Sequence, residues 1–341
     1  MRRQSILPLL GLLVSGLGMF GALAQESDAR PKPVPEVASQ TIAVAPGADL
    51  PLYVSRDWSQ PLPDITRAVI VQHGRARNAS VYFKTALTAQ AAAGAAGQTA
   101  LMIAPQFIDQ LDVDTFHVPA NVLRFTPEGW EGGDPAIAPQ PISSFTALDA
   151  ILARLGDKHL FPNLRDVVVA GHSGGGQVVQ RYAIMGKGGA ALAAAGISLR
   201  YVVANPSSYA YFSPDRPEPA IAAQCPGYND WKYGMDHLPA YAAPKTPAEL
   251  ERDYVSRRVI YMLGALDVDP HHPVLDRSCM GEAQGPFRWA RGHAYIAAMQ
   301  ARDAGTPNHT LHEIAGVGHD GDKMFTSACG LAALFDGPSC R

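Results

Sequence analysis

The sequence predicts an α/β fold in which a doubly wound, mostly parallel sheet carries helices on both faces. Short runs rich in β-branched residues, such as 68–71 and 167–169, alternate along the chain with segments of helical character, as in βαβ units. The runs are apolar without interruption, which is typical of strands buried on both faces. One run ends in a Gly-His-Ser-Gly-Gly turn at 171–175 and continues as a helix, and binding sites of such sheets lie at the carboxyl ends of the strands.

The chain begins with a predicted secretory signal peptide, residues 1–24. Met1-Arg2-Arg3 is cationic, a Leu- and Gly-rich apolar run follows, and Ala22-Leu23-Ala24 offers a small-residue cleavage site. The alternative is an uncleaved membrane anchor, which Pro8 and the glycines of the run disfavour. No later stretch is long and apolar enough to cross a bilayer. We therefore expect a secreted or periplasmic protein without stable membrane insertion after cleavage.

A proline- and charge-rich stretch within 25–40 predicts a flexible lead-in, and 41–341 is the expected folded domain. The strands expected first, 41–44 and 50–54, are edge-strand candidates on either side of the turn at Pro46-Gly47-Ala48. The remaining expected strands are 68–73, 100–104, 167–171, 201–204, 259–263 and 310–314, and the expected helices are 79–90, 144–155, 177–183 and 292–302.

Two long segments interrupt the alternation, at about 107–141 and 206–247. Loops of this length inside a compact domain are usually binding loops or covers of an active site. We expect these cap-like insertions to face the substrate. The alternative is that they are exposed insertions without function.

Charge and cysteine content narrow the class of protein. The net charge of −3 and the lack of a basic stripe argue against a nucleic-acid partner. Four cysteines in an exported chain indicate two disulfides. Of the three pairings, the sequence-nearest one, Cys225–Cys279 with Cys329–Cys340, is favoured. No C-x-x-C pair is present, which disfavours a zinc site. The oligomeric state stays open.

Ser173 is the expected nucleophile. Strand, tight turn and helix with serine at the apex form the G-x-S-x-G nucleophile elbow, in which side chains at Gly171 and Gly175 would obstruct the close approach of strand and helix. The helix N-terminus behind Ser173 supplies positive partial charge. A merely flexible glycine loop is the alternative, and the flanking strand and helix favour the elbow.

A serine nucleophile needs a base and an acid that orients the base. Of the eleven histidines, His319 directly follows the last expected strand on a glycine-rich turn and is the candidate base. Asp267 is the first choice for the acid and Asp269 the alternative, because both end the strand 259–263 and either gives the order Ser, Asp, His. Asp320 is disfavoured because it adjoins His319.

Other histidines receive different assignments. His172 adjoins Ser173 too closely to turn back on it, so it is expected to pack beside the elbow. The pair His271-His272 is a weak metal-binding pattern.

Backbone donors for an oxyanion are expected at two turns. One is the N–H of Gly174, directly after the nucleophile. The other is the N–H of Arg75 or Gly74, in the turn that follows the strand 68–73. An ordinary strand-ending turn at Gly74 is the alternative.

The chain resembles the α/β-hydrolase superfamily across essentially the whole mature region. The resemblance depends on His73-Gly74, on Gly171-His172-Ser173-Gly174-Gly175, on Gly264-Ala265-Leu266-Asp267 and on Gly318-His319. The stretches around Cys225 and Cys279 look like those of a secreted subgroup of uncharacterised hydrolases. His73-Gly74-Arg75 lacks the longer His-Gly-Gly-Gly run of the lipase-like branch, which speaks against a lipase.

Together these features predict a serine hydrolase that cleaves a carboxylic ester through an acyl-enzyme, with Ser173, His319 and Asp267 as catalytic residues and no metal or organic cofactor. The substrate is a small or a polymeric ester. Two alternatives stay open: a peptidase or amidase on the same fold, and a non-catalytic binding protein of that fold.

Overall fold

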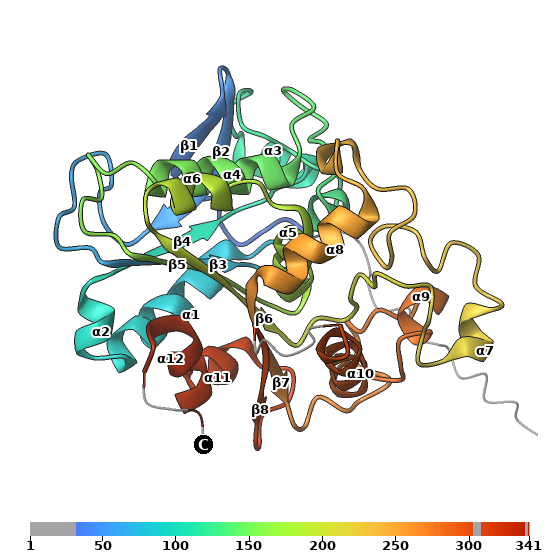
Figure 1. Cartoon of the computed structure of the whole chain (residues 1–341). Helices are drawn as coiled ribbons and strands as arrows, with labels where there is room; N and C mark the ends of the chain where they lie inside the picture. Colours follow the sequence, from blue (N-terminus) through green and yellow to red (C-terminus); the bar gives the residue numbers. More distant parts are fainter. Residues whose placement is uncertain (1–31, 303–307, 338–339, 341) are drawn as a thin grey trace, which may run out of the picture. The chain divides into compact units, whose positions relative to one another are not determined.

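In a computed structural model, which describes residues 32–302, 308–337 and 340, eight strands of the described chain form one sheet. The strand order is β1-β2-β4-β3-β5-β6-β7-β8 (Figure 1). β1 and β2 form an antiparallel hairpin, β2 pairs antiparallel with β4, and all other neighbours are parallel. The strands are β1 Gln40–Ala45, β2 Ala48–Val54, β3 Arg67–Gln72, β4 Ala100–Pro105, β5 Asp166–His172, β6 Ser198–Ala204, β7 Arg258–Gly264 and β8 His309–Ile314.

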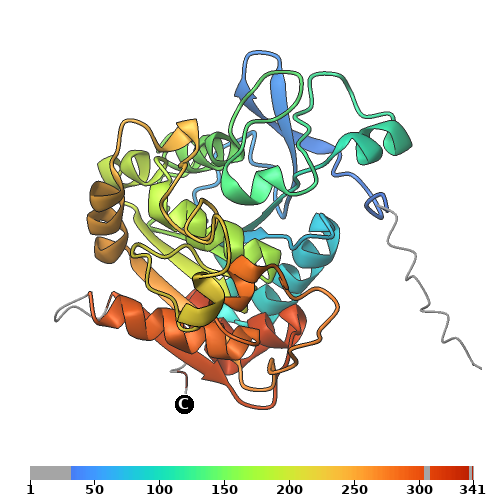
Figure 2. The ribbon, with the colours of Figure 1, turned by 90° about the vertical axis from the view of Figure 1, so that its right-hand side faces the viewer.

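Helices cover both faces of the sheet (Figures 1 and 2). One face packs against α1, α11 and α12, and the other against α4, α5, α6, α8 and α10. Residues along each central strand alternate between the two cores: Val69 belongs to one and Ile70 to the other, as the strand period of two requires. The helices on the faces are α1 Ala79–Ala92, α4 Ser144–Leu155, α5 Gly174–Met185, α6 Gly189–Ala194, α8 Pro247–Ser256, α10 Arg288–Gln300, α11 Gly321–Thr326 and α12 Ala328–Phe335, and a short helix α2, Ala95–Gln98, follows α1.

The register of the central strands sets the place of the site. Gln72 of β3 pairs with Gly171 of β5, His172 pairs with Ala204 of β6, and Gly264 of β7 pairs with Ile314 of β8. The turns that follow these strands therefore lie along the same edge of the sheet. They are the turns that carry the residues singled out in the sequence.

Three irregular segments lie outside the alternation of strand and helix. The first, 107–141, contains α3 (Gln110–Phe116) and the 3-10 helix η1 (Gly129–Gly132), and the second, 206–247, contains α7 (Pro219–Ala222) and the 3-10 helix η2 (Ala240–Ala242). The third, 265–287, contains α9 (Cys279–Glu282); it was not expected from the sequence. In both views the yellow segment with α7 and the orange segment with α9 lie side by side.

The structure contains both disulfides of the favoured pairing. Cys225–Cys279 joins the second irregular segment to the third, and Cys329–Cys340 joins α12 to the end of the chain. The longer bridge therefore links two segments that are separated in sequence by α8 and β7.

Further differences from the expectations concern β2, α10 and the lead-in. β2 is not an edge strand, because it pairs with β1 and with β4. α10 begins at Arg288 rather than at 292, and its first turn carries charged residues that an apolar pattern does not mark. Part of the expected flexible lead-in is held in place: Val34 and Ala38 are buried, and their N–H groups donate to Asp112 and Gln106.

The predicted signal peptide and the start of the predicted lead-in lie outside the described residues. Within the described part of the chain, no helix combines the length and the apolar character that a bilayer span requires.

Candidate active site

Ser173 stands at the apex of the turn between β5 and α5. Its backbone has φ 59° and ψ −125°, a conformation that costs a non-glycine residue about 1–3 kcal/mol and that the surrounding structure must hold. The neighbouring glycines make the turn possible. A Cβ at Gly171 would lie 2.3 Å from the carbonyl oxygen of Gly175, and one at Gly175 would lie 2.2 Å from the carbonyl oxygen of Gln72. The tight turn leaves the hydroxyl of Ser173 facing the edge of the sheet.

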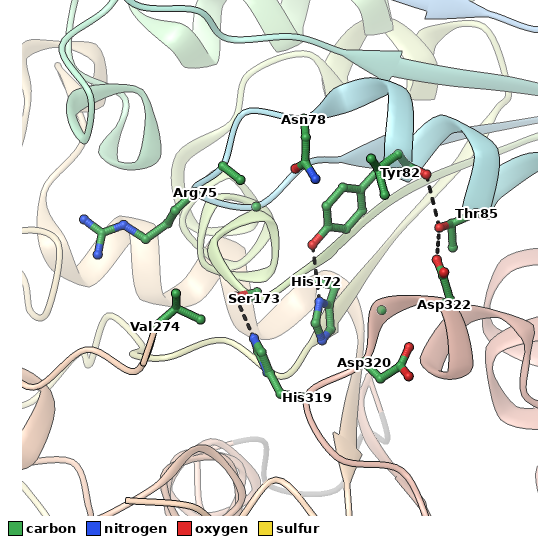
Figure 3. Close-up of a pocket in the computed structure, with 14 residues that line it drawn as sticks. Arg75, Asn78, Tyr82, Thr85, His172, Ser173, Val274, His319, Asp320 and Asp322 are labelled. Carbon is green, nitrogen blue, oxygen red and sulfur yellow. Dashed lines mark hydrogen bonds between the residues drawn. The ribbon is translucent and has the colours of Figure 1, made fainter. Parts of the chain in front are cut away.

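Ser173, His319 and Asp267 are joined by two hydrogen bonds. Nε2 of His319 lies 2.9 Å from Oγ of Ser173, and Nδ1 of His319 lies 2.8 Å from Oδ2 of Asp267. Figure 3 shows the imidazole of His319 directed at Ser173. The three residues come from the turns after β5, β8 and β7. In this arrangement the imidazole can take the hydroxyl proton while the carboxylate holds the Nδ1–H tautomer, which is the geometry required for acyl transfer.

The structure distinguishes between the two candidate acids. Asp267 is buried, and its carboxylate contacts His319. Asp269 is exposed, and its Oδ1 accepts a hydrogen bond from the N–H of His271. The disfavoured Asp320 caps α11 by accepting from the N–H of Lys323. Asp267 is therefore the carboxylate that the fold brings to the imidazole.

Arg288 binds the other oxygen of Asp267. This arginine is fully buried at the start of α10, and its Nη1 lies 3.3 Å from Oδ1 of Asp267. It also donates to Oγ of Ser207 at 3.0 Å and to the carbonyl oxygen of Val274 at 2.6 Å. The guanidinium thus fixes the acid to two of the irregular segments. Sequence reasoning missed it; the only signal was an arginine next to a tryptophan before the apolar pattern of the helix.

Two further histidines pack against the imidazole of His319. The ring centroid of His172 lies 4.5 Å from that of His319, and the centroid of His272 lies 4.9 Å away. Burial, with smaller effects of His319 and Arg288, holds the pKa of His172 well below its usual value. Burial also lowers the pKa of His272. Both neighbours therefore stay uncharged beside His319 near neutral pH. The expected packing role of His172 agrees with this position.

The two expected oxyanion turns lie against each other. The backbone nitrogen of Arg75 is 3.0 Å from the point where a Cβ on Gly174 would stand. As the first residue of α5, Gly174 has an N–H without an acceptor inside the helix, and no described residue accepts from the N–H of Arg75. These two groups can serve one oxyanion. The carbonyl oxygen of Gly74 accepts hydrogen bonds from the N–H of Arg77 and from the side chain of His73, and these bonds hold the turn.

His73 fixes the turn that carries Arg75. The side chain is fully buried; its Nδ1 donates to the carbonyl of Gly74 at 2.8 Å, and its Nε2 accepts from the N–H of Phe107 at 3.0 Å. Burial lowers the pKa of His73 to about 4. The neutral ring therefore ties the oxyanion turn to the first irregular segment, a role that the sequence did not reveal.

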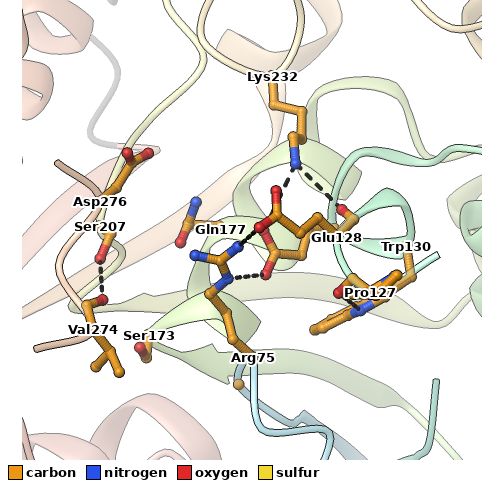
Figure 4. A network of polar contacts seen from close by, with 12 residues as sticks. Arg75, Pro127, Glu128, Trp130, Ser173, Gln177, Ser207, Lys232, Val274 and Asp276 are labelled. Carbon is orange, nitrogen blue, oxygen red and sulfur yellow. Dashed lines mark hydrogen bonds and ion pairs between the residues drawn. The ribbon is translucent and has the colours of Figure 1, made fainter. Parts of the chain in front are cut away.

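Two cavities meet at Ser173. The first has a volume of about 390 Å³ and contains His319, His172 and side chains of α1 and α11 in its walls (Figure 3). The second has a volume of about 280 Å³ and is lined mostly by polar and charged side chains (Figure 4). Arg75 and Val274 border both cavities. The wall of the second cavity is drawn from all three irregular segments: Glu128, Glu131, Ser207, Lys232, Tyr233, Val274, Asp276, Ser278 and Met280, together with Arg75, Ser173, Gln177 and Arg181.

The described residues contain no group of three or more His, Cys, Asp and Glu side chains placed to hold a metal ion. The weak motif His271-His272 has other contacts: the ring of His272 packs on His319, and the N–H of His271 donates to Asp269.

The fold is similar to solved structures of low sequence identity. A poly(3-hydroxybutyrate) depolymerase from Bordetella parapertussis matches with a TM-score of 0.60 and 22% identity over 88% of this chain and 91% of that one. Poly(aspartic acid) hydrolase-1 from Sphingomonas sp. KT-1 matches with a TM-score of 0.59 and 21% identity over 86% of this chain and 96% of that one. No protein-family profile and no curated protein matches this sequence. The likeness at this identity concerns the fold.

Proposed function

We propose that this chain, whose fold is that of the α/β-hydrolase superfamily, is a serine hydrolase that cleaves carboxylic esters through an acyl-enzyme. The observation that carries the proposal is the continuous pair of hydrogen bonds from Ser173 through His319 to Asp267. A hydrolase needs such a relay, whereas a binding protein has no use for a strained serine hydrogen-bonded to an imidazole.

The proposed reaction has two halves. Oγ of Ser173 attacks the ester carbonyl while Nε2 of His319 takes the hydroxyl proton, and the tetrahedral oxyanion is held by the N–H groups of Gly174 and Arg75. His319 then returns the proton to the leaving alcohol. Water repeats the sequence on the acyl-enzyme and releases the acid. Each oxyanion donor contributes about 3–4 kcal/mol of transition-state stabilisation.

The same chemistry serves a small ester or a repeating polyester. Both similar structures are described by their names as enzymes that act on polymers, which supports including polymeric esters among the substrates to be tested. We also propose secretion or a periplasmic location, which the two disulfides support.

Replacement of the nucleophile tests the proposal. Ser173→Ala is expected to reduce turnover of p-nitrophenyl acetate by about 10⁶-fold, because residues of a triad act as a unit, and to abolish labelling by a fluorophosphonate probe. Ser256→Ala is the matched control, since Ser256 only donates to the carbonyl of Asp253 on the exposed end of α8. Turnover that survives in Ser173→Ala contradicts the assignment. Faster cleavage of peptide anilides than of esters by the wild type would favour an amidase.

A further inference from the structure

We infer that the 280 Å³ cavity beside Ser173 is a subsite for a carboxylate on the acyl part of the substrate, so that the preferred esters are monoesters of short dicarboxylic acids. The inference depends on the proposed hydrolase function and specifies its substrate class. It follows from the charges in the wall of the cavity and from the position of that wall relative to the triad.

The second cavity lies on the acyl side of the nucleophile. His319, which must deliver a proton to the leaving alcohol, lines the 390 Å³ cavity and is not part of the wall of the second. The leaving group must therefore lie in the first cavity, close to Nε2 of His319. The acyl chain is left with the second cavity, which Ser173 also borders.

Three cations surround one buried carboxylate in this wall. Oε1 of Glu131 lies 3.2 Å from Nε of Arg75, and its Oε2 lies 3.9 Å from both Nη1 of Arg181 and Nζ of Lys232. Glu131 and Arg181 are almost completely buried. The wall holds two further acids, Glu128 and Asp276, so its three positive charges are matched by three carboxylates. A substrate carboxylate can bind to these cations only where it replaces one of the acids.

Of these three acids, Glu128 is the exposed one. Its carboxylate bonds to Nη2 of Arg75, and its carbonyl oxygen accepts from Nζ of Lys232 at 3.2 Å. Figure 4 shows Arg75 and Lys232 approaching Glu128 from opposite sides. The side chain of Glu128 is 64% exposed, and ion pairs at such exposure contribute little. A substrate carboxylate can displace it and take both cations, with the forked geometry that a guanidinium offers to carboxylates.

The remaining acid in the wall, Asp276, already has its own donors. Its carboxylate accepts from the hydroxyl of Tyr233 at 2.8 Å, from Oγ of Ser278 at 2.7 Å and from the N–H of Ser278 at 3.0 Å. Because Asp276 keeps these donors, Glu128 is the acid of the wall that a substrate carboxylate can replace.

Arg75 connects the cationic group to the oxyanion turn. Its backbone N–H is one of the two proposed oxyanion donors, and its Cγ lies 2.8 Å from the point where a Cβ on Gly174 would stand. A carboxylate on the guanidinium of Arg75 and a carbonyl held by the N–H of Gly174 are therefore joined by a short chain. Monomethyl succinate, with two methylene groups between carbonyl and carboxylate, has this form.

Monomethyl succinate and its neutral isostere, methyl 4-methylpentanoate, provide the comparison. Hydrolysis is followed by pH-stat titration at pH 7.5. The wild type is expected to prefer monomethyl succinate by about 10- to 100-fold in kcat/KM, the range of one or two charge-assisted hydrogen bonds, and to lose part of this preference in high salt. Lys232→Met is expected to remove most of the preference. Lys245→Met is the matched control, because Lys245 pairs with Asp253 outside both cavities.

A second variant keeps the test valid if Lys232→Met does not fold. Glu128→Gln removes the exposed competitor and is expected to lower the KM for monomethyl succinate severalfold without a matching change for the isostere. A wild type that cleaves the isostere as well as or better than monomethyl succinate overturns the carboxylate subsite and leaves the hydrolase intact. If neither ester is cleaved, slowing of fluorophosphonate labelling by monomethyl succinate but not by methyl 4-methylpentanoate supports the subsite, and equal labelling rates overturn it. A wild type that is neither hydrolytic nor labelled overturns the proposed function itself.

Discussion

Asp267→Asn is expected to disable the site through the tautomer of His319. In the structure Oδ2 of Asp267 accepts from Nδ1 of His319, and Oδ1 accepts from Arg288. An asparagine has only one acceptor oxygen. Arg288 can only donate, so the amide oxygen turns toward the buried guanidinium and the NH₂ group turns toward His319. The imidazole must then carry its proton on Nε2, where it cannot accept the proton of Ser173.

The expected loss is about 10⁴-fold in kcat, as for a triad held in the wrong tautomer, which corresponds to about 5.4 kcal/mol in the activation free energy. Initial rates with p-nitrophenyl acetate measure the loss, and the thermal unfolding midpoint shows whether the variant is folded. Asp269→Asn is the matched control and is expected to change kcat less than about twofold, because an exposed substitution away from the site perturbs little. A larger loss in Asp269→Asn than in Asp267→Asn would refute the assignment of the acid.

Arg288 supplies a sharper test of the same reasoning. When Arg288→Met is added to Asp267→Asn, the amide is free to turn its oxygen to His319, so the double variant is expected to regain on the order of tenfold over Asp267→Asn, the value of about one hydrogen bond. If the double variant is less active than Asp267→Asn while still folded, the guanidinium does not orient the amide and the tautomer argument is wrong.

Two further predictions concern stability. Burial lowers the pKa of His73 from 6.5 to about 4, so the contribution of His73 to the free energy of unfolding is complete above pH 6.5 and is lost as the pH falls toward 4. Urea unfolding at pH 7.5 and 4.5 should show that the free energy of unfolding falls by roughly 2–3 kcal/mol less in His73→Gln than in the wild type. An equal fall in both proteins would contradict the buried neutral ring. Removal of the Cys225–Cys279 bridge, with a sequence separation of 54, should lower the free energy of unfolding by about 4 kcal/mol. Removal of Cys329–Cys340, with a separation of 11, should lower it by about 3 kcal/mol. Urea unfolding of the two double alanine variants compares these losses, and a larger loss for Cys329–Cys340 would show that loop length does not govern the stabilisation by these bridges.

Local sequence was sufficient for much of the fold and for the three residues that meet at the sheet edge. Ser173 directly follows β5, whose apolar run is clear in the sequence, and His319 lies on the glycine-rich turn after β8. The end of a strand fixes where the following turn lies. The sequence alone could not decide between Asp267 and Asp269, because both belong to one turn. Only the path of the backbone in the structure decides which carboxylate turns inward.

The buried charges could not be predicted in the same way. Glu131 contacts Arg75, Arg181 and Lys232, which lie on three other segments of the chain. No periodicity or spacing in the sequence records contacts between such distant segments. The same reason hid Arg288, which lies 21 residues from its partner Asp267. β2 was placed at the edge because its strand pattern does not reveal that it turns back to pair with β4.

Val274 has a consequence for redesign of the proposed hydrolase. Val274 is 53% exposed and borders both cavities, and its carbonyl oxygen accepts a hydrogen bond from Arg288. A change of the side chain therefore alters a wall that the two cavities share and leaves this backbone contact in place. Glycine or alanine at 274 would widen the space that a long chain needs on both sides of the scissile bond, and a bulky residue would restrict the proposed hydrolase to short, single esters.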